Sequence, residues 1–181
     1  MKFDLIVLGG GSGGIASAVR AAMHGAKVAV IEQQYLGGTC VNVGCVPKKV
    51  MWYGAQIQSL INQAVDYGFD MTPPKFNWPE LCASRDKYIE RLRTLYQARF
   101  DSLGIEFING FGTFSAANTI DVNGVPHQAE HIIIATGGKP AMPSIPGIEH
   151  ALSSDDFFQL SEQPKKVAIV GSGYIAVEIA G

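Results

Sequence analysis

Two cysteines separated by four residues, Cys40 and Cys45, carry the most specific chemistry in the sequence. Thiol–disulfide exchange needs two thiols close enough to bridge and one that can become a thiolate, and Gly44 between them allows the backbone to bend. A zinc site needs about four nitrogen or sulfur ligands, and the sequence offers no second Cys or Cys/His pair. Considered alone, the two cysteines are equally compatible with a buried structural role, because free cysteine is commonly buried.

A glycine motif supplies the second candidate site. Gly9, Gly11 and Gly14 form G-x-G-x-x-G between an apolar run and a segment of small residues. Such glycines allow a tight turn and a close approach of the backbone to a pyrophosphate, which the N–H groups of the following helix then bind. Glu32 ends the next apolar run. A carboxylate at this place accepts hydrogen bonds from ribose hydroxyls and repels a 2′-phosphate. The pattern predicts a site for the ADP moiety of FAD or NAD; the alternative is an ordinary glycine turn with no ligand. A nucleotide site so close in the sequence favours a redox role for the cysteines.

A βαβ unit must position both motifs. Residues 4–8 and 27–31 read as buried parallel strands because they are apolar and β-branched, and residues 15–23 read as the helix between them. Further along, the spacing predicts helices over 48–65, over 79–103 and near 154–160, a small antiparallel meander within 105–135 that turns at Asn123-Gly124, and a buried strand over 167–170. That last strand leads into a second glycine motif, G-x-G-x-x-A, which begins at Gly171.

Composition narrows the class of protein. The 181 residues include 14 basic and 16 acidic side chains, for a net charge of -2, and 47% of the chain is hydrophobic. This balance is typical of a globular domain, and the chain has no excess of positive charge with which to bind nucleic acid. Three cysteines are too few for a disulfide scaffold, and no apolar run approaches the ~18 residues that a membrane span needs. With no signal peptide at the start, we expect a cytoplasmic, reducing location and no membrane partner.

The cysteine stretch, Gly37 to Lys49, resembles that of the flavoprotein disulfide reductases, a pyridine nucleotide-disulfide oxidoreductase family, and Ala135-Thr136-Gly137-Gly138 extends the likeness. The ending Val46-Pro47-Lys48-Lys49 is most similar to the glutathione reductase branch, with lipoamide dehydrogenase and other disulfide reductases as alternatives. The resemblance implies an α/β fold: a Rossmann-like FAD-binding domain over 1–165, with a parallel sheet, helices and a small antiparallel β-meander, then the truncated start of a Rossmann-like NAD(P)-binding domain over 166–181.

The resemblance also implies roles for single residues. Cys40 would attack the substrate disulfide, Cys45 would form the charge-transfer pair with the flavin, Lys48 would lie near the flavin N5 and pair with Glu178, and Tyr96 would lie in the glutathione pocket. The implied FAD contacts are Gly9, Gly11, Ser12, Gly13, Gly14, Glu32, Gly38, Thr39, Cys40, Lys48, Gly112, Ala135, Thr136 and Gly137. The implied contacts near the nicotinamide are Gly171, Ser172, Gly173, Tyr174, Ile175 and Glu178. No metal site is expected, since the four histidines show no ligand spacing.

By the same resemblance, electrons would pass from NADPH to FAD, then to the Cys40–Cys45 disulfide, and then to glutathione disulfide. Members of the family are homodimers in which the partner subunit supplies a His–Glu pair. Because members are much longer, we expect this chain to be the N-terminal part of one and to be inactive alone. The alternative from another class is a non-enzymatic FAD- or ADP-binding module, or an inert fragment.

Overall fold

The computed structural model describes residues 2–72 and 74–181. The chain divides into two compact units: the first holds the residues through Asn42 and Glu90–Lys139, and the second holds Val43–Ile89 and Pro140–Gly181. The helices are α1 (Ser12–Met23), α2 (Gly38–Val43), α3 (Cys45–Ala64), α4 (Trp78–Leu103), α5 (Ser154–Phe157) and α6 (Tyr174–Ala180), with 3₁₀ turns at Val65–Tyr67 and Ile148–His150. The strands are β1 (Lys2–Leu8), β2 (Val28–Glu32), β3 (Glu106–Asn109), β4 (Gly112–Ala116), β5 (Thr119–Val122) and β6 (Val125–Ile134).

The βαβ unit predicted from the sequence forms the centre of the first unit. β1 and β2 run parallel, with Leu5 opposite Val28, and α1 connects them. Gly25 follows this helix in a left-handed conformation, with φ +89°, and its N–H donates to the Ala22 carbonyl at 2.9 Å. Glycine is favoured at this place because a side chain is strained there. The helix ends where the sequence predicts and begins three residues earlier, at Ser12.

The described strands form one six-stranded sheet in the order β3-β2-β1-β6-β5-β4. The first part of β6 pairs antiparallel with β5, and from Gln128 onward the strand runs parallel to β1. The predicted meander is therefore β4–β6, and its hairpin turns at Asn123 (φ +54°) and Gly124 (φ +81°). The prediction that residues 106–109 belong to the antiparallel meander is wrong. They form β3, which pairs in parallel with β2 at the sheet edge, a long-range contact that local alternation does not encode.

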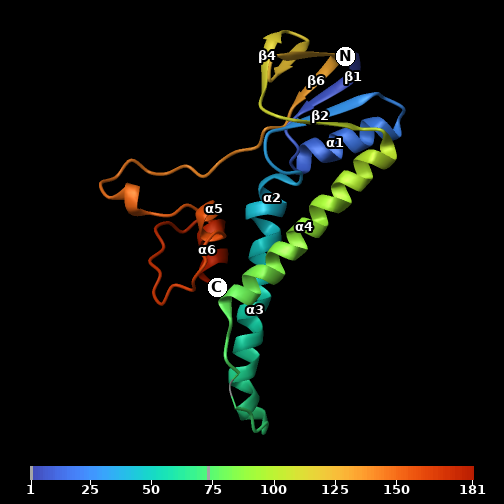
Figure 1. Cartoon of the computed structure of the whole chain (residues 1–181). Helices are drawn as coiled ribbons and strands as arrows, with labels where there is room; N and C mark the ends of the chain where they lie inside the picture. The colour runs from blue at the N-terminus through green and yellow to red at the C-terminus, as the bar shows by residue number, and fades with distance from the viewer. Residues whose placement is uncertain (1, 73) are drawn as a thin grey trace. The chain divides into compact units, whose positions relative to one another are not determined.

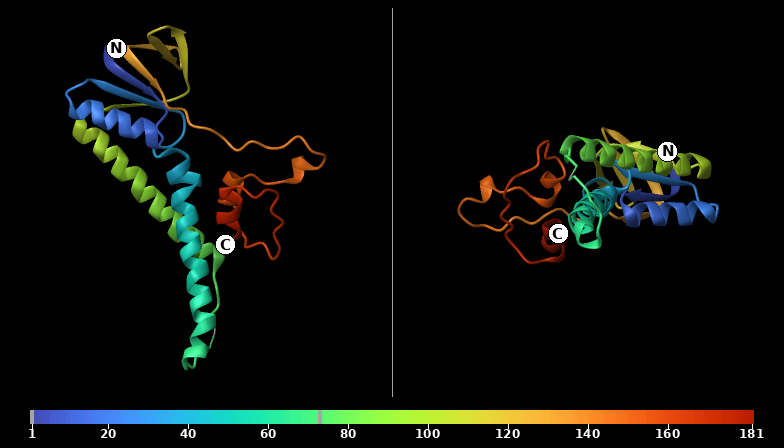
Figure 2. Two further views of the ribbon diagram at one scale, coloured as in Figure 1. Left: turned by 180° about the vertical axis from the view of Figure 1, so that it is seen from behind. Right: turned by 90° about the horizontal axis from the view of Figure 1, so that it is seen from below.

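Apolar side chains cover both faces of the parallel strands. On one face Val7 and Val30 pack with Ala18 of α1 and Phe100 of α4. On the other face a second cluster includes Ile120 of the meander. Successive residues of a strand point to opposite faces, so β1 and β2 contribute to both clusters. Figures 1 and 2 show α1 and the end of α4 against the same face of the sheet.

In the second unit α3 runs beside the first part of α4 (Figure 1), and a Cβ at Gly54 would lie 3.4 Å from Leu81. The Trp78 Nε1–H donates to the Leu160 carbonyl at 3.0 Å and ties the segment after Pro140 to α4. The buried strand predicted over 167–170 is wrong: Val170 is 81% exposed. A strand needs a neighbour with which to exchange backbone hydrogen bonds, and no described residue pairs with this segment.

None of the helices that the structure describes is both long enough and apolar enough to cross a membrane.

Candidate functional site

The glycine turn between β1 and α1 is built without side chains because backbone fills the space that they would need. A Cβ at Gly9 would overlap the Ala135 carbonyl, and one at Gly14 would overlap the Gly9 carbonyl. Gly11 caps α1 in an extended conformation, and the first helical bond runs from the Ile15 N–H to the Gly11 carbonyl at 2.9 Å. The N–H groups of the first turn therefore point out of the helix without helical acceptors, as an anion site requires.

Glu32 fastens this turn to the end of β2. Its Oε2 accepts the Gly10 N–H at 2.9 Å, and its Oε1 accepts the Gln34 N–H at 2.8 Å. A carboxylate has about four lone-pair positions, so each oxygen keeps one for a further donor such as a ribose hydroxyl. The contact with Gly10 is a function of Glu32 that the sequence pattern did not show.

The segment that carries the first cysteine lies against the same turn. The Gly37 N–H donates to the Gly10 carbonyl at 2.8 Å, and a Cβ at Gly38 would lie 2.7 Å from the Cα of Gly11. α2 begins here and holds Thr39 and Cys40, of which Cys40 is partly buried. The structure thus brings the glycine turn and the Cys40 segment together, as the predicted site needs.

Two residues that hold the Cys40 segment are not predicted from the sequence. The Asn42 Nδ2 donates to the Gly38 carbonyl at 2.8 Å and to the Leu36 carbonyl at 3.2 Å. The Arg93 Nε on α4 donates to the Asn42 Oδ1 at 2.8 Å. Asn42 stands within the cysteine motif and could have been considered there, whereas the sequence gives no signal for Arg93, which is 51 positions away.

In the second unit, Cys45 is exposed at the first residue of α3, one turn before Lys48. The Lys48 Nζ lies 2.7 Å from the Glu178 Oε2, so the structure contains the ion pair expected from the sequence. Hydrogen bonding to Lys48 and its positive charge lower the pKa of the Glu178 carboxyl, and the charge of Lys49 adds a smaller effect in the same direction. The pair holds an ammonium and a carboxylate together at the ends of α3 and α6.

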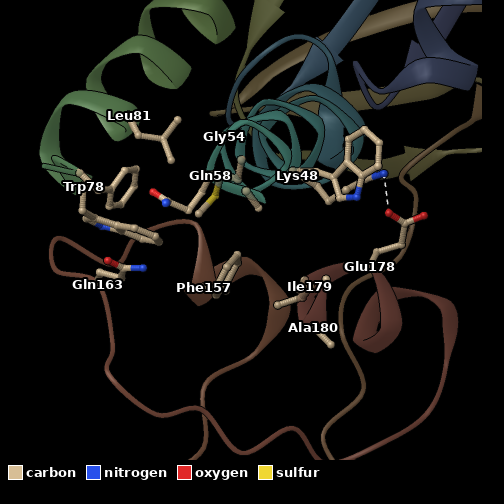
Figure 3. A pocket seen from close by; sticks show the side chains of 15 residues that line it. Lys48, Gly54, Gln58, Trp78, Leu81, Phe157, Gln163, Glu178, Ile179 and Ala180 are labelled. Atoms are coloured by element: carbon tan, nitrogen blue, oxygen red, sulfur yellow. Dashed lines mark ion pairs between the residues drawn. The ribbon is translucent and has the colours of Figure 1, made fainter. Parts of the chain in front are cut away.

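A cavity of about 530 Å³ adjoins this ion pair (Figure 3). Trp78, Leu81, Phe157 and Ile179 contribute apolar walls, while Lys48 and Glu178 lie at one side. An apolar cavity with a few polar groups is the usual character of a small-molecule site.

The structure describes the surroundings of three of the remaining predicted residues. Gly112 begins β4, where a Cβ would lie 2.5 Å from Leu8, so packing alone explains this glycine. Tyr96 packs against the core of the first unit, and Tyr174 is 81% exposed. Contacts of these residues, and of Ser12, Gly13, Thr136, Gly137, Gly171, Ser172, Gly173 and Ile175, with a cofactor or substrate stay predictions. The described residues hold no group of three or more metal-binding side chains.

The first unit fits the ADP part of a flavin dinucleotide. The turn from Gly9 to Gly14 is built largely of glycines, with no room for side chains at Gly9 and Gly14, α1 offers unpaired N–H groups, and Glu32 keeps acceptor capacity. These are the three features that a dinucleotide site needs.

Comparison with known proteins agrees with this fit. The family described as pyridine nucleotide-disulphide oxidoreductase matches residues 3–181. The curated glutathione reductase of Yarrowia lipolytica (strain CLIB 122 / E 150) is 47% identical over 193 aligned positions, which cover 99% of this chain and 41% of the relative. The chain therefore spans less than half the length of that relative.

Proposed function

Because the chain belongs to the pyridine nucleotide-disulphide oxidoreductase family, we propose that it carries the FAD site and the redox-active thiols of a disulfide reductase. The observation that supports this most directly is the contact of the Gly38 segment, which leads to Cys40, with the glycine turn at Gly11. A nucleotide site and a thiol on one rigid support are what electron transfer from a cofactor to a disulfide requires.

We assign the first glycine turn, Glu32 and Thr39 to FAD, and Lys48 to the reactive edge of its ring. Bound FAD supplies two-electron chemistry between a nicotinamide and a disulfide. The Lys48 ammonium lies 2.7 Å from the Glu178 carboxylate and would stabilise negative charge that develops on a flavin bound there. The segment after Gly171 is assigned to the nicotinamide nucleotide, with NADPH as the reductant. Residues 1–165 and 166–181 are the proposed limits of the FAD-binding and NAD(P)-binding parts.

The thiol steps follow from exchange chemistry. The Cys40 thiolate attacks one sulfur of an external disulfide, whose S–S bond breaks; the other sulfur leaves as a thiolate that takes a proton from solvent, and a mixed disulfide forms on Cys40. The Cys45 thiolate then attacks the Cys40 sulfur, releases the second thiol and closes the Cys40–Cys45 disulfide. The pair thereby loses two electrons, which bound FAD, with NADPH as the proposed reductant, would return.

The similarity to a glutathione reductase supports glutathione disulfide as the substrate. A homodimer in the cytoplasm is proposed on the same ground. The non-enzymatic nucleotide-binding module remains the competing proposal, and the thiols distinguish the two.

Flavin binding tests the nucleotide site. We expect the reduced chain mixed with FAD to retain flavin absorbance after gel filtration, and Glu32→Ala to weaken binding at least tenfold. The control is Glu130→Ala, which removes an exposed carboxylate paired with Lys2 at 3.6 Å. A colourless protein, or equal binding by the two variants, would overturn the assignment.

Disulfide mapping tests the thiols. We expect mild oxidation followed by peptide mass spectrometry to find a Cys40–Cys45 bridge that dithiothreitol opens, and Cys82→Ser to leave that bridge unchanged. Cys82 lies on α4 with its Sγ 3.9 Å from the Leu160 carbonyl. Bridges that form to Cys82 as often as between the other two would support the non-enzymatic reading.

A further inference from the structure

Helix α2 is too short to hold its own position. It has six residues, and a helix of that length is unstable in isolation because few hydrogen bonds compensate for nucleation. Its Val41 side chain is buried and its first residue, Gly38, packs on Gly11, but these two contacts do not fix the far end of the helix, where Asn42 lies. The orientation of α2 therefore depends on polar contacts with its neighbours.

Asn42, at the end of the helix, makes those contacts in two directions. Its amide nitrogen bonds the Gly38 and Leu36 carbonyls, which closes the helix onto the loop before it. Its amide oxygen accepts the Arg93 Nε–H at 2.8 Å. A hydrogen bond from a charged donor is about twice as strong as a neutral one, so the bond to α4 is the stronger of these anchors.

Arg93 is itself held on three sides. Its Nη1 donates to the Glu90 Oε2 at 3.1 Å, and its guanidinium carbon lies 3.7 Å from the centre of the Tyr35 ring. The side chain is only 25% exposed. A planar guanidinium can serve a carboxylate, an amide and an aromatic face at once, which a lysine ammonium cannot do.

We propose that Arg93 is a positioning residue for Cys40: through Asn42 it sets the orientation of α2, and with it the direction of the Cys40 thiol. Helical residues are about 100° apart, so Cys40 and Asn42 lie about 200° apart around α2. The anchor thus holds the helix from the side opposite the thiol. The catalytic meaning of this inference rests on the proposed function, whereas the positioning itself does not.

The rate of alkylation of each thiol tests the positioning. The reduced chain is treated with iodoacetamide, and the peptides that contain Cys40 and Cys82 are quantified by mass spectrometry. We expect Arg93→Ala to raise the ratio of the Cys40 rate to the Cys82 rate about fivefold or more, because a loosened α2 exposes its partly buried thiol. Arg91→Ala, which removes the same side chain from an exposed position of α4, leaves the ratio unchanged.

A double-mutant cycle with Asn42→Ala shows whether Arg93 acts through Asn42. We expect Arg93→Ala to change the ratio little once Asn42 is already alanine. General loosening of the fold would raise the rates at Cys40 and Cys82 together, so a constant ratio in Arg93→Ala would overturn the proposal, as would full additivity in the cycle. These outcomes do not depend on flavin binding or disulfide mapping, so failure of the proposed function is seen separately.

Discussion

At the scale of single residues, Gly38 meets two demands at once. Its φ is +57°, and a Cβ would lie 2.7 Å from the Cα of Gly11. A side chain at this place would be strained by its backbone and would also separate α2 from the glycine turn. The motif Gly37-Gly38 is therefore explained by packing of the thiol segment on the nucleotide turn.

We expect Gly38→Ala to lower the free energy of unfolding in urea by about 2–3 kcal/mol. Gly68→Ala is the matched control, because Gly68 has φ +83° with no described atom within 4 Å of an added Cβ. That variant carries the backbone strain alone, about 1 kcal/mol. Equal losses in the two variants would contradict the contact between Gly38 and Gly11.

The Lys48–Glu178 pair has a definite pH dependence. Because folding lowers the pKa of Glu178, its contribution to stability is complete above the ordinary carboxyl pKa of 4.5 and is lost as the pH falls through the lowered value. We expect a carbon-13 NMR titration to show the pKa of Glu178 rising in Lys48→Met, and rising less in Lys49→Met, since Lys48 is the main cause. An equal rise in both variants would contradict the ion pair.

At the scale of elements, the sequence predicts what depends on local periodicity. The βαβ unit, the Asn123-Gly124 hairpin and helices α3, α4 and α5 follow from apolar spacing and turn residues that act within a few positions, whereas the short helix α2 is not predicted. The prediction fails where the structure of a segment depends on pairing with residues distant in the sequence. β3 pairs with β2 although Glu106 comes 77 positions after its partner Ala29, and residues 167–170 have a strand's composition but pair with no described strand. The cysteines and glycines of the site could be predicted because they stand in short local motifs. Arg93 could not, because its contact with Asn42 joins residues 51 positions apart.

Strand β6 carries a polar side chain that its surroundings do not satisfy. His127 is 6% exposed, and its Nδ1 has no hydrogen-bond partner among the described residues. Since an unsatisfied buried polar atom costs about 1–3 kcal/mol, we expect His127→Leu to raise the free energy of unfolding by about 1 kcal/mol. His131→Leu, at an exposed position of the same strand, should change it by less than about 0.5 kcal/mol. A clear loss in His127→Leu would contradict the view that the Nδ1 atom is left without a hydrogen bond.

At the scale of the whole molecule, the two units differ in how well their backbone is protected. The first unit has a sheet with apolar clusters on both faces. In the second unit, the segment around Lys165 and Lys166 is exposed and has no regular structure. Exposed backbone without ladder or helix hydrogen bonds is where proteases cut first.

We therefore expect brief trypsin treatment to cleave first after Lys165, Lys166 or Lys75, which is also exposed and outside the helices and strands. Lys87 and Arg91 are exposed too, but they lie within α4, where the backbone must unfold before it enters a protease. Mass spectrometry of the early products gives the order of cleavage. First cuts within α4, with the bonds after Lys75, Lys165 and Lys166 intact, would contradict the exposed and irregular backbone of those segments.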